Sequence, residues 1–319
     1  MLTKAMMQYL VILLDDTAVS FCHYGNEKKE RRPMPLDVLR EGIRFGMKEN
    51  LRIQFVYPDY GLPPAYADLV ESIDHSKIMP ASRAGEEADV VVMDGLDEAR
   101  ATALRRGVAY VLRLGREELL DGVDELGRML AGADRLNVVL TDVEQFAAAD
   151  FDRYARALAA LSPAVEQLYA SGQAPQLNLL TDRMMLSAMN NCGAGDTVLT
   201  LAPDGRFYPC PAFYQASGGY SVGTLADGPD VKNPQLYRLD HAPLCRRCDA
   251  YQCRRCVWLG RRLTREVNTP GHEQCVLAHL ERNASRQLLA DIRRHGTFLP
   301  GQEIKEIGYL DPFDARQEW

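Results

Sequence analysis

The sequence predicts an α/β protein that carries a second, smaller and cysteine-rich domain. Over roughly the first 185 residues, short apolar runs alternate with amphipathic stretches, the pattern of a chain in which strands and helices alternate. After Asp182 this periodicity stops, and glycine, proline and cysteine become frequent. Seven of the eight cysteines lie between positions 192 and 275. At 319 residues the chain is long enough for two domains.

Six short runs rich in valine, isoleucine or leucine are predicted to form buried parallel strands. They are Tyr9–Leu14, Arg52–Tyr57, Asp89–Asp94, Ala109–Leu114, Leu136–Leu140 and Gln176–Leu180. Helices are predicted between them, at Pro35–Glu49, Leu96–Arg106, Glu117–Ala131 and Asp150–Ser171. Apolar residues recur at helical spacing in the first of these helices, which predicts an apolar stripe for core packing.

The later part of the chain is predicted to begin with a hairpin. Thr197–Ala202 and Arg206–Tyr208 read as its strands, joined by a turn at Asp204-Gly205. Residues 215–245 are predicted to be rich in loops, and residues 273–294 to form a helix with an apolar face. The predicted units are therefore residues 1–185, an α/β domain, residues 186–295, the cysteine-rich domain, and residues 296–319, a polar tail.

Composition and charge exclude several classes of function. The chain is 46% hydrophobic and 25% charged, as globular proteins are, and its net charge of −7 argues against a general nucleic-acid binder. The apolar start, Ala5–Leu14, is short and ends in Asp15-Asp16 without a cleavage site, so it predicts a strand rather than a signal peptide. No segment approaches the roughly 20 apolar residues of a membrane helix. We therefore expect a cytoplasmic protein in a reducing compartment, which disfavours disulfides.

The cysteine pattern is the most specific chemical signal in the sequence. A C-x2-C-x4-C-x2-C run is preceded by two cysteines and followed by one; the seven are Cys192, Cys210, Cys245, Cys248, Cys253, Cys256 and Cys275. Four thiolates can hold a four-iron cluster or a structural zinc ion. Iron–sulfur is favoured, because zinc ribbons usually separate their two C-x2-C pairs by some 15–20 residues. Seven cysteines make one complete site and a set of three, which would leave one iron open.

The stretch from Cys192 to Cys210 resembles the opening of a SPASM domain. That domain is the auxiliary iron–sulfur module at the C-terminus of many radical SAM peptide-maturation enzymes. Its pattern is an early cysteine, a hairpin with G-x4-C, a gap, a tight run of four cysteines and a last cysteine. Gly205 and Cys210 match the G-x4-C, the run matches next, and Cys275 matches the last position. The resemblance covers about the last third of the chain.

The resemblance implies one or two 4Fe–4S clusters and a division of the thiolates. Carried over by position, one cluster uses Cys192, Cys210 and Cys256, and the other uses Cys245, Cys248, Cys253 and Cys275. The family run is usually C-x2-C-x5-C-x3-C, whereas this chain has the shorter spacers x4 and x2. The shorter spacers leave the division of ligands open, with zinc as the alternative metal.

The N-terminal domain resembles a radical SAM barrel without its catalytic motif. Radical SAM enzymes bind their catalytic cluster through C-x3-C-x2-C in the loop after the first strand, where this chain has Cys22 alone. The Gly-Gly-Glu segment after the second strand, which binds the SAM amino group, is replaced by Phe55–Tyr60 (FVYPDY). The implied fold is a degenerate, partial TIM-type radical SAM barrel followed by a small SPASM-like domain.

The segments QYLVILLDDTAVSFCHYGN, IQFVYPDYGLP and CDAYQCRRC extend the resemblance to nearly the whole chain. They are similar to the maturases associated with CXXX-repeat peptides, a pseudo radical SAM/SPASM group. The resemblance implies two partners, a genuine radical SAM peptide maturase and a cysteine-rich precursor peptide. The expected role is that of a partner subunit without SAM cleavage. Two alternatives remain: an independent iron–sulfur or thiol redox enzyme acting on a peptide, and a zinc-stabilised binding scaffold.

A cluster of arginines adjoins the cysteine run. Residues 245–265 hold seven arginines against one acid, and a charge run of this kind is either a solvated face or a docking site for an acidic peptide or a partner. The candidate docking residues are Arg246, Arg247, Arg254, Arg255, Arg261 and Arg262.

Several single residues near the predicted sites favour an ordinary structural interpretation. Cys22 is a weak candidate for a catalytic thiol and is otherwise a partly buried free thiol, with His23 beside it as a loop residue. His272 and His279 flank Cys275 and could enter a zinc site. The pair Asp15-Asp16 ends the first strand and is expected to cap the next turn.

Overall fold

A nine-stranded sheet dominates the computed structural model, which describes residues 7–253 and 255–304. Across the sheet the strands run in the order β7-β6-β5-β4-β3-β2-β1-β8-β9. Their bounds are β1 Tyr9–Leu13, β2 Arg52–Val56, β3 Ser76–Pro80, β4 Val90–Asp94, β5 Ala109–Leu114, β6 Arg135–Leu140, β7 Gln176–Leu177, β8 Val198–Leu201 and β9 Phe207–Tyr208. Within the described residues β7 and β9 are the two edges, so the sheet is open.

The strands β1 to β8 pair in parallel, and only the pairing of β8 with β9 is antiparallel. Strand β1 lies between β2 and β8, with Tyr9 paired to both Arg52 and Val198. The turn from β8 to β9 contains Gly205 at a φ of 74°, a conformation that glycine adopts without strain. The predicted hairpin is thus confirmed, and its first strand extends the parallel sheet. A separate small hairpin pairs β10 (Gly223–Thr224) with β11 (Gly228–Pro229).

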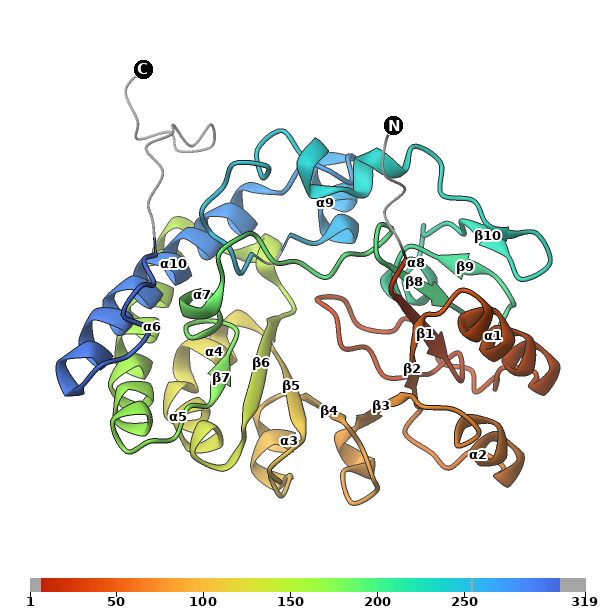
Figure 1. The fold of residues 1–319 in the computed structure, drawn as a ribbon, viewed down its shortest axis with the longest axis horizontal. Coiled ribbons are helices and arrows are strands. Elements are labelled where there is room, and N and C mark those ends of the chain that lie inside the picture. Colours follow the sequence, from red (N-terminus) through yellow and green to blue (C-terminus); the bar gives the residue numbers. More distant parts are fainter. Residues whose placement is uncertain (1–6, 254, 305–319) are drawn as a thin grey trace.

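Helices connect the strands, and Figure 1 shows them along the outer side of the curved sheet. Between the strands lie α1 Leu36–Lys48, α2 Pro64–Val70, α3 Leu96–Ala101, α4 Arg116–Asp121, α5 Val123–Gly132 and α6 Ala148–Ala170. The remaining helices are α7 Asp182–Met185, α8 Ala212–Gln215, α9 Val257–Thr264 and α10 His272–Ile292. Short 3-10 turns occur at Ala81–Arg83, Val143–Gln145, Pro234–Tyr237, Leu239–His241 and Arg293–His295.

The structure corrects several element predictions. The strand predicted at Gln176–Leu180 is limited to Gln176–Leu177. The strand β3 and the helix α2 were not predicted. The helix predicted at Glu117–Ala131 is two helices, α4 and α5, which meet at Gly122. A β carbon at Gly122 would lie 2.5 Å from the backbone carbonyl oxygen of Glu118, so this close approach requires glycine. The helix predicted at Leu96–Arg106 is shorter and ends at Ala101.

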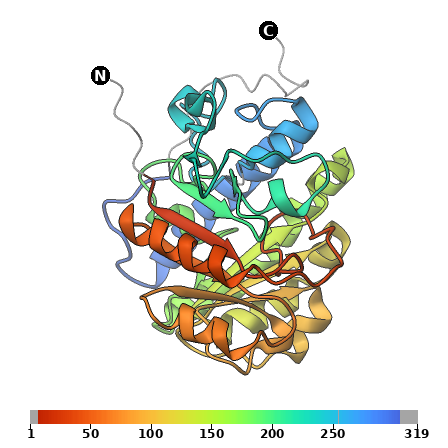
Figure 2. The same ribbon diagram turned by 90° about the vertical axis from the view of Figure 1, so that its right-hand side faces the viewer.

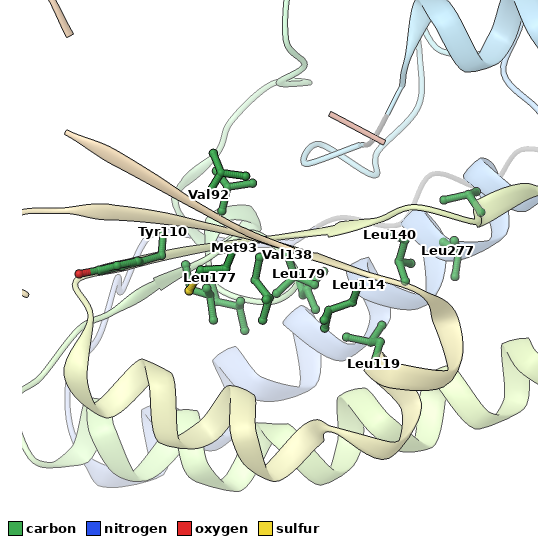
Figure 3. Packing of buried hydrophobic residues seen from close by; sticks show 14 of the residues in the cluster. Val92, Met93, Tyr110, Leu114, Leu119, Val138, Leu140, Leu177, Leu179 and Leu277 are labelled. Atoms are coloured by element: carbon green, nitrogen blue, oxygen red, sulfur yellow. The ribbon is translucent and has the colours of Figure 1, made fainter. Parts of the chain in front are cut away.

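The two faces of the sheet support two apolar cores. Along β1, Leu10 and Ile12 point into one core and Val11 and Leu13 into the other, as the alternation of a strand requires. Figure 3 shows the larger core, in which side chains of β4, β5, β6 and the segment after β7 meet Leu277 of α10. The C-terminal helix is therefore part of the main core.

The segments after residue 186 lie close to the α/β part of the chain. Figures 1 and 2 show α10 alongside α6, and α9 with its flanking loops across one end of the sheet. Beyond α10, Arg293 donates hydrogen bonds to the carbonyls of Phe298, Leu299 and Gln302, which holds residues 298–302 against the helix. The boundaries predicted at 185 and 295 stay predictions, and residues 305–319 of the predicted tail lie outside the described residues.

Candidate metal centres at the carboxyl end of the sheet

The loop after β1 lies over the carboxyl ends of two distant strands. Arg113 is the penultimate residue of β5, and its Nε donates to the backbone carbonyl of Cys22 at 3.1 Å. A ring nitrogen of His23, Nδ1, is 2.8 Å from the carbonyl oxygen of Leu140, the last residue of β6. Asp94 forms an ion pair with Arg113 at 3.0 Å and so orients its guanidinium. Cys22 is thereby held at the end of the sheet where parallel α/β folds place their sites.

The C-terminal segments cover this loop from the other side. The ring of Tyr24 meets that of Trp258 edge to face at a centroid distance of 6.0 Å. The side-chain amide of Gln215 donates to the carbonyl of Ala18 at 2.9 Å, and the hydroxyl of Tyr214 donates to Asp16. Helices α8 and α9 therefore hold the β1 loop against the sheet.

Three other cysteines reach the same place from separate elements. Cys192 precedes a tight turn in which the backbone N–H of Gly195 donates to the carbonyl of Pro209 at 3.0 Å, next to Cys210. Cys256 is the N-cap of α9, and its Sγ accepts from the backbone N–H of Leu259 at 3.4 Å. Cys210 is buried, Cys22 and Cys256 are half-buried, and Cys192 is exposed.

The electrostatics group these four thiols together. Burial raises the pKa of Cys22 far above its usual value, and the negative charges of Cys256 and Cys192 raise it further. Burial likewise raises the pKa of Cys210, with further contributions from Cys22, Cys256 and Cys192. Burial and the charge of Cys192 raise the pKa of Cys256 to about 12. The neighbouring thiols thus oppose ionisation of Cys22, Cys210 and Cys256, and a bound cation would remove that opposition.

A second group of thiols lies within the C-x2-C-x4-C-x2-C run. Burial raises the pKa of Cys253 to about 12, and the charges of Cys245 and Cys248 add to the effect. Burial also raises the pKa of Cys245, whereas the guanidinium of Arg255 lowers it. The charges that act on Cys253 come from this group and from Arg183, and those that act on Cys22 come from the first group and Arg113. These interactions divide seven of the eight described cysteines into two groups, Cys22, Cys192, Cys210 and Cys256 in the first and Cys245, Cys248 and Cys253 in the second.

A histidine of α10 adjoins the second group. The Nε2 of His279 lies 3.6 Å from the Sγ of Cys248, and a carboxylate oxygen of Asp249 lies within 4.8 Å of both ligand atoms. Asp249 also forms a buried ion pair with Arg282 at 2.6 Å. Cys275 lies one helical turn before His279 on α10, so the two side chains share a face of that helix. This arrangement offers sulfur and nitrogen ligands at one place.

The donor sets fit a soft metal or an iron–sulfur cluster. Main-chain N–H groups face several of the sulfurs: Ala212 faces Cys210, Arg255 faces Cys253, and Ala250 faces Cys248 at 3.4 Å. Such hydrogen bonds stabilise thiolates and tune the potential of iron–sulfur clusters. The residues present could hold a cluster of four thiolates in the first group, and either a cluster or a zinc ion in the second.

The predicted arginine cluster does not form one surface. Arg255 is buried at 5% exposure and donates to the carbonyl of Tyr237. Its side chain therefore points inward, toward Cys245 of the second group of cysteines. Arg246, Arg247 and Arg262 are exposed, whereas Arg261 is half-buried over aromatic rings. Arg254 lies outside the described residues.

A pocket of about 600 Å³ adjoins α9. It is lined by Glu27, Ser217, Gly218, Trp258, Arg261, Arg262 and Arg265. Arg262 lies over the ring of Tyr24, 5.1 Å from its centroid, which connects the pocket to the β1 loop. The three arginines that line this pocket, Arg261, Arg262 and Arg265, lie on α9 or directly after it.

Two further predictions concern Asp15-Asp16 and His272. Asp15 is buried, and its carboxylate accepts from the backbone N–H of Thr17 at 2.7 Å and from the hydroxyl of Tyr60 at 2.7 Å. The expected turn cap is thus confirmed for Asp15. The ring of His272 meets that of Phe151 at 6.1 Å, centroid to centroid.

Comparison with solved structures identifies the fold. One chain, described as native anSMEcpe with bound AdoMet, matches with a TM-score of 0.55 at 11% identity, over 89% of this chain and 99% of that one. The same protein with bound AdoMet and Kp18Cys peptide matches with a TM-score of 0.56 at 11% identity, again over 89% and 99%. The mixed α/β fold with its large parallel sheet therefore matches radical SAM enzyme structures.

No family model matches this chain, and no curated protein matches it. Across residues 7–253 and 255–304, no helix is both long and apolar enough to cross a membrane.

Proposed function

We propose that this chain is a partner subunit in the maturation of a cysteine-rich ribosomal repeat peptide. It binds one or two 4Fe–4S clusters and does not cleave SAM by itself. In this role the chain binds the precursor peptide or the radical SAM maturase that modifies it. Its clusters serve as structural centres, as electron relays or as the place where a peptide thiolate meets an open iron.

The observation that carries the proposal is that the cysteines form two clusters of thiols over the carboxyl end of the sheet. Soft thiolate sets of this kind suit iron–sulfur clusters. The fold is shared with structures of a protein that holds AdoMet and a peptide, which supports a peptide substrate for this chain as well. The β1 loop has one cysteine where cleavage of SAM needs three, which supports a role without SAM chemistry.

The pocket beside α9 supports a docking role for the arginines. Arg262 and Arg265 are exposed at its wall, opposite Glu27 from the β1 loop. Guanidinium groups bind carboxylates in a bidentate manner, and steering by a basic patch is strongest at low salt. We therefore propose that an acidic segment of the precursor peptide binds along α9.

The first experiment is a metal analysis of anaerobically purified protein. Iron and sulfide in equal amounts, with a visible absorption band that bleaches on reduction, would support the cluster proposal. Zinc without iron would overturn it. The same preparation, incubated with SAM and a strong reductant, should form no 5′-deoxyadenosine, and formation of that product would overturn the partner-subunit assignment.

The second experiment separates a partner subunit from an independent enzyme. The repeat peptide is incubated with this chain alone, with the radical SAM maturase alone and with both, and its mass is measured. A mass change that requires both proteins supports the proposal. A change with this chain alone would favour an independent iron–sulfur or thiol redox enzyme.

A zinc-stabilised scaffold is the second candidate function, and one observation favours it. His279 lies 3.6 Å from the sulfur of Cys248, and mixed sulfur and nitrogen ligands are typical of zinc. One equivalent of zinc that is lost in a His279→Ala variant would support this candidate for the second thiol group. Unchanged metal content in that variant would exclude His279 as a ligand.

A further inference from the structure

We propose that Cys22 is the fourth thiolate of the first metal centre, so that one cluster is held by Cys22, Cys192, Cys210 and Cys256. This inference rests on the cluster binding proposed above and assigns a ligand that the cysteine pattern of the C-terminal segment does not contain. The β1 loop, which in radical SAM enzymes holds the catalytic cluster, would then serve the auxiliary one.

The backbone of Cys22 is fixed at this place by contacts on both sides. On the side of the sheet, Arg113 donates to its carbonyl at 3.1 Å. On the other side, Tyr24, two residues later, packs on Trp258, two residues after Cys256. Cys22 and Cys256 are therefore each two residues away in sequence from this aromatic contact.

The side chains around the first centre agree with this position. The carbonyl of Cys210 accepts from the backbone N–H of Phe213 at 3.1 Å, at the start of α8, and Gln215 of α8 donates to the carbonyl of Ala18 in the β1 loop at 2.9 Å. The β1 loop that carries Cys22 thus contacts the segments that carry Cys210 and Cys256, although Cys22 lies 170 positions before Cys192 in sequence. A thiol that only fills space in a core is surrounded by apolar groups instead.

The local charges also suit a site of four thiolates. The guanidinium of Arg113 donates to the carbonyl of Cys22 at 3.1 Å, and Arg255 directly precedes Cys256. A cluster with four thiolates carries net negative charge, and buried cations beside it reduce the cost of burying that charge. Arg113 is 6% exposed and Arg255 is 5% exposed.

A complete ligand set has a chemical consequence. With three protein thiolates, one iron of the first cluster stays open to a substrate atom. With Cys22 as the fourth ligand, every iron of that cluster is bound to the protein, and a peptide thiolate has no position there. The first centre then acts as a structural or electron-transfer centre that joins the β1 loop to α8 and α9. An open iron in the second centre requires that one of its four cysteines is not a ligand.

The test measures iron in a protein that retains only the first centre. The variant Cys245→Ala, Cys248→Ala, Cys253→Ala removes the second group, and its iron and sulfide are measured after anaerobic reconstitution with ferrous iron and sulfide. We expect about four irons per chain in this background, and at least a twofold loss on adding Cys22→Ala. Unchanged iron and an unchanged EPR spectrum of the reduced protein would overturn the inference.

A conservative variant and a measurement on the native chain guard against misfolding. Cys22→Ser in the full chain should keep the iron and shift the EPR g values, because an oxygen replaces one sulfur ligand. In the unaltered protein, alkylation of Cys22 and Cys192 followed by mass spectrometry should be at least tenfold slower with the cluster than after its removal. Equal alkylation of Cys22 in both states would contradict its role as a ligand.

The two proposals can fail separately. Unaltered protein that reconstitutes without iron overturns both the proposed function and the inference. Unaltered protein that holds iron, together with a Cys22→Ala variant identical to it in iron, sulfide and EPR, overturns the inference alone. The variant Cys22→Ala is compared with Cys192→Ala, which removes a thiolate of the same centre and should give the same loss of iron.

Discussion

A buried ion pair between α7 and α10 gives the sharpest stability prediction. Arg183 and Glu281 form it, and the side chain of each is 1% exposed. The guanidinium also donates to the carbonyls of Asn178 and Leu179, each at 3.0 Å, and to that of Gln252, beside Cys253. The pair therefore connects the end of the sheet, the C-terminal helix and the cysteine run.

The perturbation is Glu281→Gln, which keeps the shape and leaves an oxygen for the hydroxyl of Tyr154. It removes the charge that compensates a guanidinium buried at 1% exposure. Removing one partner of a buried pair costs about 3–5 kcal/mol of unfolding free energy. With an m value of about 3 kcal/mol per molar urea, the unfolding midpoint should fall by more than about 1 M.

The assay is urea unfolding at pH 7, followed by far-UV circular dichroism. The matched control is Glu41→Gln in the exposed pair of Arg44 and Glu41, whose side chains are 65% and 57% exposed. That control should lose less than about 0.5 kcal/mol. A loss below about 1 kcal/mol in Glu281→Gln would refute the reasoning, since the buried guanidinium would then have found another partner or water.

Three further predictions concern pH, packing and docking. In metal-free protein the free energy of unfolding should fall above pH 8.5 or so, by about 1.4 kcal/mol per pH unit per thiol. The reason is that burial raises the pKa of Cys256 to about 12 in the folded protein, so this thiol keeps a proton that the unfolded chain loses. Urea unfolding from pH 7 to 10 measures the free energy of unfolding, and a free energy that does not change with pH would contradict the prediction. Gly42→Ala places a β carbon 2.3 Å from a leucine side chain of β8 and should cost about 1–3 kcal/mol, whereas Gly85→Ala, with nothing within 4 Å, should leave the melting temperature nearly unchanged. Arg262→Glu with Arg265→Glu should weaken binding of an acidic peptide at low salt by at least tenfold in a fluorescence titration, and a difference that persists in 0.5 M salt would argue against a charge effect.

The sequence predicted the strands best where their side chains alone determine the structure. The run Asp89–Asp94 contains three consecutive valines and forms β4, with Val91 and Val92 buried. Strand β3 was missed because its sequence, SKIMP, contains a lysine and a proline. Lys77 is accommodated there by an ion pair with Glu71 at 2.6 Å, and parallel pairing with β2 and β4 supplies the rest. Such tertiary support leaves no local pattern in the sequence.

The candidate site was predictable only in part, and Cys22 shows why. The spacing of the later cysteines indicates a metal site, since neighbouring thiols on short loops converge. Nothing near Cys22 in sequence connects it to Cys256, because the connection runs through Arg113, Tyr24 and Trp258, which are distant in sequence. The prediction of Arg255 as a docking residue was wrong for the same reason. A run of arginines is usually solvated, and only the packing of the whole chain shows that this one is buried.

The arrangement also predicts which parts of the chain depend on the metal. Strand β8 pairs with β1 along a backbone ladder, and Leu199 and Leu201 are fully buried, so the sheet has support that does not involve the thiols. Residues 243–253, in contrast, contain turns, bends and one isolated bridge, with no helix or strand among them.

Removal of the metal should therefore increase amide hydrogen exchange in residues 186–196 and 243–256 by at least tenfold and leave β1 and β8 protected, because these loops lose the links that order them while the sheet keeps its hydrogen bonds. Exchange measured by mass spectrometry on the loaded and metal-free protein distinguishes the two regions. Loss of protection in β1 and β8 would show instead that the sheet itself depends on the clusters. The metal centres would then be required for the sheet to fold, and would not merely order the loops at its end.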